Sequence, residues 1–405
     1  MRSGRMFISK DAAPASFPGR SSLAGTRILL ACITLTGIAT APAQDAAAPA
    51  APPVAKAEPA QPQRVASDNE IARWLAGLPV ENGALQNFTQ VPAWANHAKA
   101  LTAAWDGSER RRIAKVRAWA PEALGEINAS DSPVFYFFSG ADFLYPHALF
   151  PNARAYVLCA REPVGSQPEP AHIAPGELSG ALAGFRKSID ALLGFSFFIT
   201  KDLRKEVVQR NIPGILPVLE LLLAREGAVV TEVQLVRCND AGEVNTELKE
   251  KGGSSGVRIK FHMEGKPEQT LCYFYGDISN DGLKTHGGVL KFCETFGPGR
   301  SLLKAASYLP HEGAFSRINE WILTHSTAIV QDTSGIPMRG FPKDQWTFKF
   351  WGHNAAPINS FKKHYEPALA AAIKAAPSQP IPFGFGYQHE PSSSLLILAE
   401  RKKGE

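Results

Sequence analysis

A short turn carries the first residues that could do chemistry. Ser139-Gly140-Ala141-Asp142 follows the apolar run Pro133–Phe138 and precedes a predicted helix over 142–150. In open α/β sheets, ligands bind beyond the carboxyl ends of parallel strands, where such turns lie. The segment lacks the G-x-G-x-x-G pattern of dinucleotide sites. We therefore favour a structural turn in which Asp142 caps the helix, with a small-molecule or hydrolytic site as the alternative.

Two further loops contain the residue types of a hydrolase triad. His311 follows a predicted helix, and Asp332 and Ser334 follow the predicted strand 328–331. No G-x-S-x-G elbow exists, and Ser334 precedes Gly-Ile-Pro rather than a helix. Turn formation explains Asp332 and Ser334 equally well. A hydrolase with Asp142, His311, Asp332 and Ser334 as catalytic residues is therefore kept as an alternative hypothesis.

A third loop resembles a cation site. Asp277, Ser279 and Asp281 form the pattern D-x-S-x-D-G, the first half of an EF-hand calcium loop, whose oxygen ligands suit a hard cation. The twelfth position, however, holds Gly288 instead of a bidentate Glu, and a strand is predicted ahead of the loop. A plain turn is favoured, and Ca²⁺ is the one cofactor kept as an alternative. The ten His are scattered without an H-E-x-x-H motif, so the sequence gives no support for zinc.

The elements that must position these residues indicate an α/β fold. The run Pro133–Phe138, the helix over 142–150 and the strand Ala155–Cys159 form a strand-turn-helix-strand unit, which favours parallel pairing. Antiparallel strands are predicted at Val229–Arg237, Gly256–Met263 and Gln269–Tyr275, and further strands at 328–331, 346–351 and 395–398. Predicted helices cover 68–124, 178–192, 201–210, 217–225, 300–309, 316–325 and 360–375. The expected sheet is mixed, with a parallel core, an antiparallel section and flanking helices.

The first 43 residues resemble an export signal. The short apolar stretch Ile28–Ile38 follows basic residues and leads to Ala41-Pro42-Ala43, the small-x-small pattern that a signal peptidase accepts. Cleavage after Ala43 is expected. Leu29-Leu30-Ala31-Cys32 resembles a lipobox, so a lipoprotein anchored at Cys32 is the less favoured alternative. The predicted location is the periplasm or the medium.

The rest of the chain divides by composition and pattern. Residues 44–65 are rich in Ala and Pro and predict a flexible tether. A helical segment is expected over 66–130, a first α/β part over 131–227 and a second α/β part over 228–405.

The charge balance argues against nucleic acid as a partner. The 405 residues contain 43 Lys and Arg and 38 Asp and Glu, a net charge of +5. The leader holds five of the basic residues and one acid, so 38 basic and 37 acidic residues remain after cleavage. The cluster Arg110–Arg112 is expected on a solvated helix face. No stretch beyond the leader is long and apolar enough to predict a membrane span.

Four cysteines remain beyond the leader: Cys159, Cys238, Cys272 and Cys293. None belongs to a C-x-x-C pair, which argues against zinc-ribbon and thioredoxin-type motifs. An oxidising compartment permits disulfides. Cys238 and Cys272 are the first candidates for a disulfide because we expect them on neighbouring strands, whereas a buried free thiol is favoured for Cys159.

Four segments are similar to an uncharacterised family of exported bacterial proteins. They are Phe135–Tyr145, Glu162–Gly165, Lys304–Leu309 and Gln331–Pro337. The resemblance covers about residues 130 to 400; it implies export and assigns no catalytic residue. Because no complete catalytic motif is present, we favour a non-catalytic envelope protein that binds a ligand or partner over the hydrolase described above.

Overall fold

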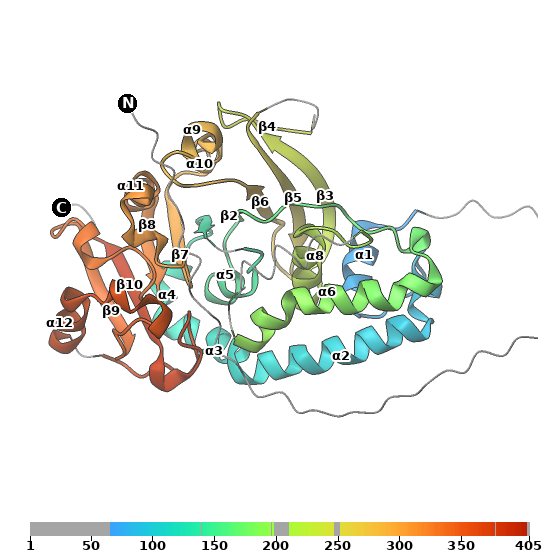
Figure 1. Cartoon of the computed structure of the whole chain (residues 1–405), viewed down its shortest axis with the longest axis horizontal. Coiled ribbons are helices and arrows are strands. Elements are labelled where there is room, and N and C mark those ends of the chain that lie inside the picture. Colours follow the sequence, from blue (N-terminus) through green and yellow to red (C-terminus); the bar gives the residue numbers. More distant parts are fainter. Residues whose placement is uncertain are drawn as a thin grey trace, which may run out of the picture. The chain divides into compact units, whose positions relative to one another are not determined.

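The computed structural model describes residues 65–138, 140–195, 197, 210–246, 252–376 and 378–402 (Figure 1). The predicted signal 1–43, the tether except Val65, Ser139, and the predicted helix 201–210 except Arg210 lie outside the described residues. Within the described ranges the fold is α/β: a ten-stranded mixed sheet flanked by helices.

Five parallel strands form the centre of the sheet. They are β1 (Val134–Phe137), β2 (Ala155–Ala160), β6 (Gln269–Tyr275), β7 (Gly299–Leu303) and β8 (Ser326–Gln331). Their spatial order is β6-β2-β1-β7-β8. Counted along the chain this is 3-2-1-4-5, so the order reverses between β1 and β7. Such a reversal is the topological switch point at which doubly wound sheets bind ligands.

Antiparallel strands extend the sheet at both edges. On one side β5 (Ser254–His262) pairs with β6, β3 (Val229–Cys238) pairs with β5, and β4 (Val244–Asn245) forms the edge. On the other side β10 (Leu395–Arg401) pairs with β8, and β9 (Trp346–Gly352) forms the edge. The sheet crosses the expected boundary at 227/228, because β2 pairs with β6 and β1 with β7.

Side chains alternate between the two faces of the central strands, as the pleat of a strand requires. The Tyr136 face shares a core with the helices of the first half of the chain. These helices are α1 (Asp68–Leu75), α2 (Pro92–Ser108), α3 (Ala114–Ala123), α4 (Gly125–Asn128), α5 (Leu144–Leu149), α6 (Pro175–Phe195) and α8 (Leu216–Arg225). Among them α2 and α6 lie side by side (Figure 1).

The Phe137 face is covered by helices of the second half. α9 (Leu283–His286), α10 (Gly288–Glu294) and α11 (Ser316–His325) share a core with it, and α12 (Pro367–Ala375) packs in a third cluster with β9 and β10. Short helices of other types are η1 (Gln86–Thr89), the π-helical η2 (Glu109–Ile113), η3 (Pro170–His172), η4 (Leu309–His311), η5 (Gly313–Phe315), η6 (Met338–Gly340), η7 (Asn359–His364) and η8 (Pro391–Ser393). None of the described helices combines the length and the apolar character that a membrane crossing requires.

The helix predicted over 300–309 is wrong, because residues 299–303 form strand β7. Arg300 on this strand is 1% exposed. Its guanidinium donates to the carbonyl of Ile127 at 3.0 Å and to Asn128 Oδ1 at 3.2 Å. A buried arginine inside a strand is stabilised here by carbonyls from a distant segment, and local sequence gives no sign of that.

The solvated helix face predicted for Arg110–Arg112 is wrong for Arg112, which is 4% exposed. Its guanidinium donates to the carbonyls of Leu192, Leu193 and Gly194 at 3.2, 2.5 and 2.9 Å. These carbonyls belong to the last turn of α6, where four acceptors lack partners within the helix. Arg112 therefore fastens the π-helical turn η2 to the end of α6.

The disulfide predicted between Cys238 and Cys272 is also wrong. All four described cysteines are free and buried. Strand β5 lies between β3, which carries Cys238, and β6, which carries Cys272. Strands two places apart are separated by about 9.5 Å, beyond the Cα span that a disulfide can bridge.

Candidate ligand-binding site

A cavity of about 410 Å³ lies at the carboxyl ends of β1, β2, β6 and β7, at the topological switch point. Its lining comes mainly from the last residues of β1 and β2 and from the loops that follow the four strands, and Phe197, beyond α6, also contributes. Polar lining residues include Tyr136, Asp142, Glu162, Asp277 and Lys304, and apolar ones include Phe138, Phe197, Ile278, Leu309 and Phe315. Cavities of a few hundred Å³ with mostly apolar walls and a few convergent polar groups are typical of small-molecule sites.

A buried ion pair lies in the wall of this cavity. Lys304 Nζ lies 3.0 Å from Asp142 Oδ2, and both side chains are 1% exposed. Tyr136 donates its hydroxyl to the same oxygen at 3.0 Å, and the backbone N–H of Tyr145 donates to Asp142 Oδ1 at 3.3 Å. The ammonium of Lys304 also lies 4.0 Å from the centre of the Tyr145 ring. Burial lowers the pKa of Lys304, and the Asp142 carboxylate opposes that shift.

The loop that follows β7 has an unusual backbone. Ala305, Ser307 and Tyr308 have φ of 51°, 54° and 54°, and Phe138 in the loop after β1 has φ of 66°. Residues other than glycine rarely adopt this left-handed region. Such strain gathers at ligand sites, where surrounding contacts hold it in place. Both strained loops contribute lining residues to the cavity.

Asp332 and Ser334 accept hydrogen bonds from the backbone of this strained loop. The N–H of Ala305 donates to Asp332 Oδ2 at 3.0 Å, and the N–H of Ala306 donates to Ser334 Oγ at 2.8 Å. Ser334 in turn donates its hydroxyl to Asp332 Oδ1. Ser334 is 0% exposed and Asp332 is 4% exposed. Both residues position backbone, and neither lines the cavity.

His311 lies in a separate group of rings. Its ring centre is 5.1 Å from that of Tyr308 and 5.3 Å from that of His364, and it does not line the cavity. Burial lowers the pKa of His311 to about 4, and the neighbouring His364 and Arg339 act in the same direction. Of the four predicted catalytic residues, Asp142 alone lines the cavity, and Ser139, in the same turn as Asp142, lies outside the described residues.

Two carboxylates stand at the ends of adjacent strands. Glu162 follows β2 and is 1% exposed, and Asp277 follows β6. Asp277 accepts the N–H of Ser279 at 2.9 Å and lies 3.4 Å from the guanidinium of Arg161. Burial acts to raise the pKa of Asp277, but the hydrogen bonds from Ser279 and the charge of Arg161 outweigh it and lower that pKa. Asp277 is therefore an ionised acceptor beside Glu162 in the cavity lining.

The predicted calcium residues form a turn in the structure. Asp277 Oδ1 accepts from Ser279, and Ser279 Oγ accepts the N–H of Gly282 at 3.1 Å. The side chain of Asp281 is 91% exposed and pairs with Lys284 at 2.8 Å. In the part of the chain that the structure describes, no three His, Cys, Asp or Glu side chains form a group that could hold a metal ion.

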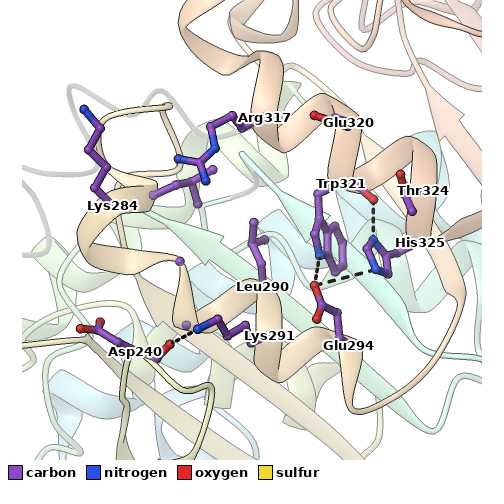
Figure 2. Close-up of a pocket in the computed structure, with 13 residues that line it drawn as sticks. Asp240, Lys284, Leu290, Lys291, Glu294, Arg317, Glu320, Trp321, Thr324 and His325 are labelled. Carbon is purple, nitrogen blue, oxygen red and sulfur yellow. Dashed lines mark hydrogen bonds and ion pairs between the residues drawn. The ribbon is translucent and has the colours of Figure 1, made fainter.

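A larger hollow of about 760 Å³ lies between α10 and α11, away from the strand ends (Figure 2). Some of its polar side chains bond within the protein. Trp321 donates Nε1 to Glu294 at 2.9 Å, and His325 Nδ1 lies 2.9 Å from the carbonyl of Trp321. Lys291 donates to the carbonyl of Asp240 at 2.7 Å. Because open α/β sheets bind ligands at the carboxyl ends of their parallel strands, we place the candidate site at the strand ends and not in this hollow.

Lys304 and Tyr136, the partners of Asp142, are not among the site residues predicted from the sequence. Lys304 was expected inside a helix, and its pairing depends on the contact between β1 and β7, which no local pattern shows. Tyr136 was recognised only as part of a buried strand. Glu162 follows the second strand, a position at which an acid binds ribose hydroxyls in dinucleotide-binding sheets, but the absence of G-x-G-x-x-G left this signal weak.

Searches against protein-family models, curated proteins and solved structures found no match to this chain.

Proposed function

We propose that this protein binds a small molecule without transforming it, and that the ligand occupies the cavity at the carboxyl ends of β1, β2, β6 and β7. The observation that carries the proposal is the coincidence of this cavity with the switch point of a 3-2-1-4-5 parallel sheet. The buried Asp142–Lys304 pair and two strained loops at the same place add to it.

The lining indicates a hydroxylated ring compound, such as a nucleoside or a glycoside. Glu162 and Asp277 offer carboxylate acceptors to a pair of neighbouring hydroxyl groups. Ile278, Leu309 and Phe315 form an apolar wall against which a ring can pack. Nucleosides and glycosides share this combination of hydroxyl groups and an apolar face, and binding measurements distinguish them.

Binding without turnover agrees with the contacts of the candidate catalytic residues. Ser334 is buried and donates its hydroxyl to Asp332. Asp142 is occupied by Lys304, Tyr136 and the N–H of Tyr145. The hydrolase hypothesis needs an accessible nucleophile next to a base, and of the residues predicted for it only Asp142 lines the cavity.

We further propose that the protein acts outside the cytosol as a periplasmic or secreted protein. The leader 1–43 with its Ala41-Pro42-Ala43 site supports export. Amino-terminal sequencing of the protein recovered from the periplasm should give Gln44 as the first residue. Recovery from the cytosol with Met1 retained would contradict export.

Ligand-observed NMR with panels of nucleosides and glycosides tests the binding proposal. Leu309→Trp fills the cavity and should abolish saturation transfer to any ligand that the wild type binds. Leu290→Trp is the matched control, since Leu290 is a half-buried leucine that lines the other hollow, and it should leave binding unchanged. Binding that survives Leu309→Trp, or absence of binding to both panels, would overturn the proposal.

A further inference from the structure

A second cavity, of about 570 Å³, adjoins the candidate site. The two cavities share Arg161, whose side chain is 61% exposed and pairs with Asp277 of the first cavity. The second cavity is lined by residues of strands β3, β5 and β6 and by residues 163–165. A ligand held at the strand ends could therefore extend past Arg161 into this space.

Three strands present a row of polar side chains to the second cavity. Arg237 on β3 lies opposite Ser255 on β5. Strands β5 and β6 are antiparallel and pair Gly256 with Phe274. One step further along this register, Ser255 lies beside Tyr275 on β6. Residues paired across adjacent strands point to the same face. A guanidinium and two hydroxyl groups therefore line one wall together.

The charge of the second cavity is positive. Arg161 and Arg237 line it, and none of its described lining residues is Asp or Glu. Arg237 donates one N–H to the carbonyl of Gly252 at 2.6 Å. Its Nε is buried and has no hydrogen-bond partner among the described residues. A buried donor without a partner is unfavourable, and an anion in the cavity would satisfy it.

We propose that the second cavity binds an anionic group, a phosphate or a carboxylate, carried by the ligand of the first cavity. Guanidinium groups match the planar, paired oxygens of both anions. The hydroxyl groups of Ser255 and Tyr275 add neutral donors at the same wall. The inference rests on the proposed function, and it narrows the ligand to a hydroxylated ring compound with one anionic substituent.

Calorimetric titrations with matched ligand pairs test the proposal. Adenosine and AMP form the phosphate pair, and methyl glucoside and methyl glucuronide form the carboxylate pair. In at least one pair the anionic member should bind the wild type tenfold or more tightly than the neutral one. Arg237→Gln should remove that preference and leave the affinity for the neutral member unchanged. Equal affinities in both pairs, or equal loss for both members of a pair, would overturn the anion site.

Two further variants show whether a lost preference for the anionic ligand is specific to Arg237. Arg154→Gln is the control, because Arg154 is a partly exposed arginine that pairs with Asp131 and lines neither cavity, and it should retain the preference. If Arg237→Gln fails to fold, Arg237→Lys keeps the charge but loses the paired donors and should reduce the preference.

Titration with inorganic phosphate alone separates the two proposals. Phosphate binding that Arg237→Gln abolishes and Leu309→Trp spares supports the anion site even if no ring compound binds. A second result is that the neutral ring compounds bind while Arg237→Gln changes the affinity for no anion. That result would support the first cavity as the ligand site and would contradict the anion site in the second cavity.

Discussion

Lys304 Nζ lies 3.0 Å from Asp142 Oδ2, and this contact joins the loop after β1 to the loop after β7. The two residues are far apart in the sequence and meet because β1 and β7 are neighbours at the switch point. Both are almost fully buried, so each depends on the other for charge compensation. The pair thereby fixes the two loops that line the proposed ligand site.

Removal of one partner should destabilise the fold strongly. Lys304→Met leaves the buried carboxylate of Asp142 without its cation and should lower the free energy of unfolding by about 3–5 kcal/mol. The double variant Asp142→Asn with Lys304→Met should lose less than the sum of the single variants. Urea unfolding measures these energies. Lys284→Met, which breaks an exposed pair with Asp281, should change stability by less than about 1 kcal/mol; an effect equal to that of Lys304→Met would contradict the role of burial.

Phe137→Ala should destabilise the central strand by about 3–5 kcal/mol, since it removes a large side chain and leaves a cavity. Phe137 is 0% exposed on β1, and its ring centre lies 5.5 Å from that of Trp321. Thermal and urea unfolding give the change. Tyr365→Ala, at a residue 53% exposed, is the control and should be nearly neutral. An unchanged melting temperature for Phe137→Ala would show that β1 is not buried.

Glu220 should make stability depend on pH. Burial raises the pKa of Glu220 from 4.5 to about 8, against the opposing hydrogen bond from Gln167. Between these values the folded state binds more protons than the unfolded state. The contribution of Glu220 to the free energy of unfolding is therefore full below pH 4.5 and is lost as the pH rises to 8. Glu220→Gln should make the free energy of unfolding less dependent on pH in this range. Unfolding by urea at pH 5 to 8.5 tests it, with Glu320→Gln as the exposed control; parallel curves for wild type and Glu220→Gln would contradict it.

The four described cysteines should be unreactive in the native state. Burial raises the pKa of Cys159 and Cys272 to about 12 and that of Cys238 to about 11, and it also raises the pKa of Cys293. A thiol reagent at pH 8 should react slowly with the native protein, because the thiolate is the reactive species. After denaturation it should count four thiols in the exported protein and five in a chain that keeps Cys32. A count of two would show a disulfide.

Strands and helices with a clear pattern of hydrophobic residues were predictable from the sequence. The run 134–137 is hydrophobic throughout because it is buried on both faces. Strands β3, β5 and β6 and helix α11 also lie where the pattern predicted them. Strand β7 was not predictable in this way. Its Arg300 donates to the carbonyl of Ile127 and to Asn128 Oδ1, and no local sequence pattern shows these tertiary contacts.

The candidate site was predictable to a smaller extent. A Gly turn after a buried strand identified Asp142, because strand ends are where α/β sheets bind ligands. Asp332 and Ser334 were predicted as catalytic residues from their types. In the structure these side chains accept hydrogen bonds from the backbone of the Ala305–Tyr308 loop. Lys304 could not be identified, since its role follows from the pairing of β1 with β7.

The position of β1 in the sheet also affects how the chain reaches its final state. β1 bonds to β2, which comes soon after it, and to β7, which comes much later. During synthesis, one edge of a strand that is buried on both faces thus stays exposed until residues 299–303 emerge. Unpaired apolar edges recruit other chains and aggregate. A holding chaperone that shields residues 134–137 in the meantime should raise the yield of this protein.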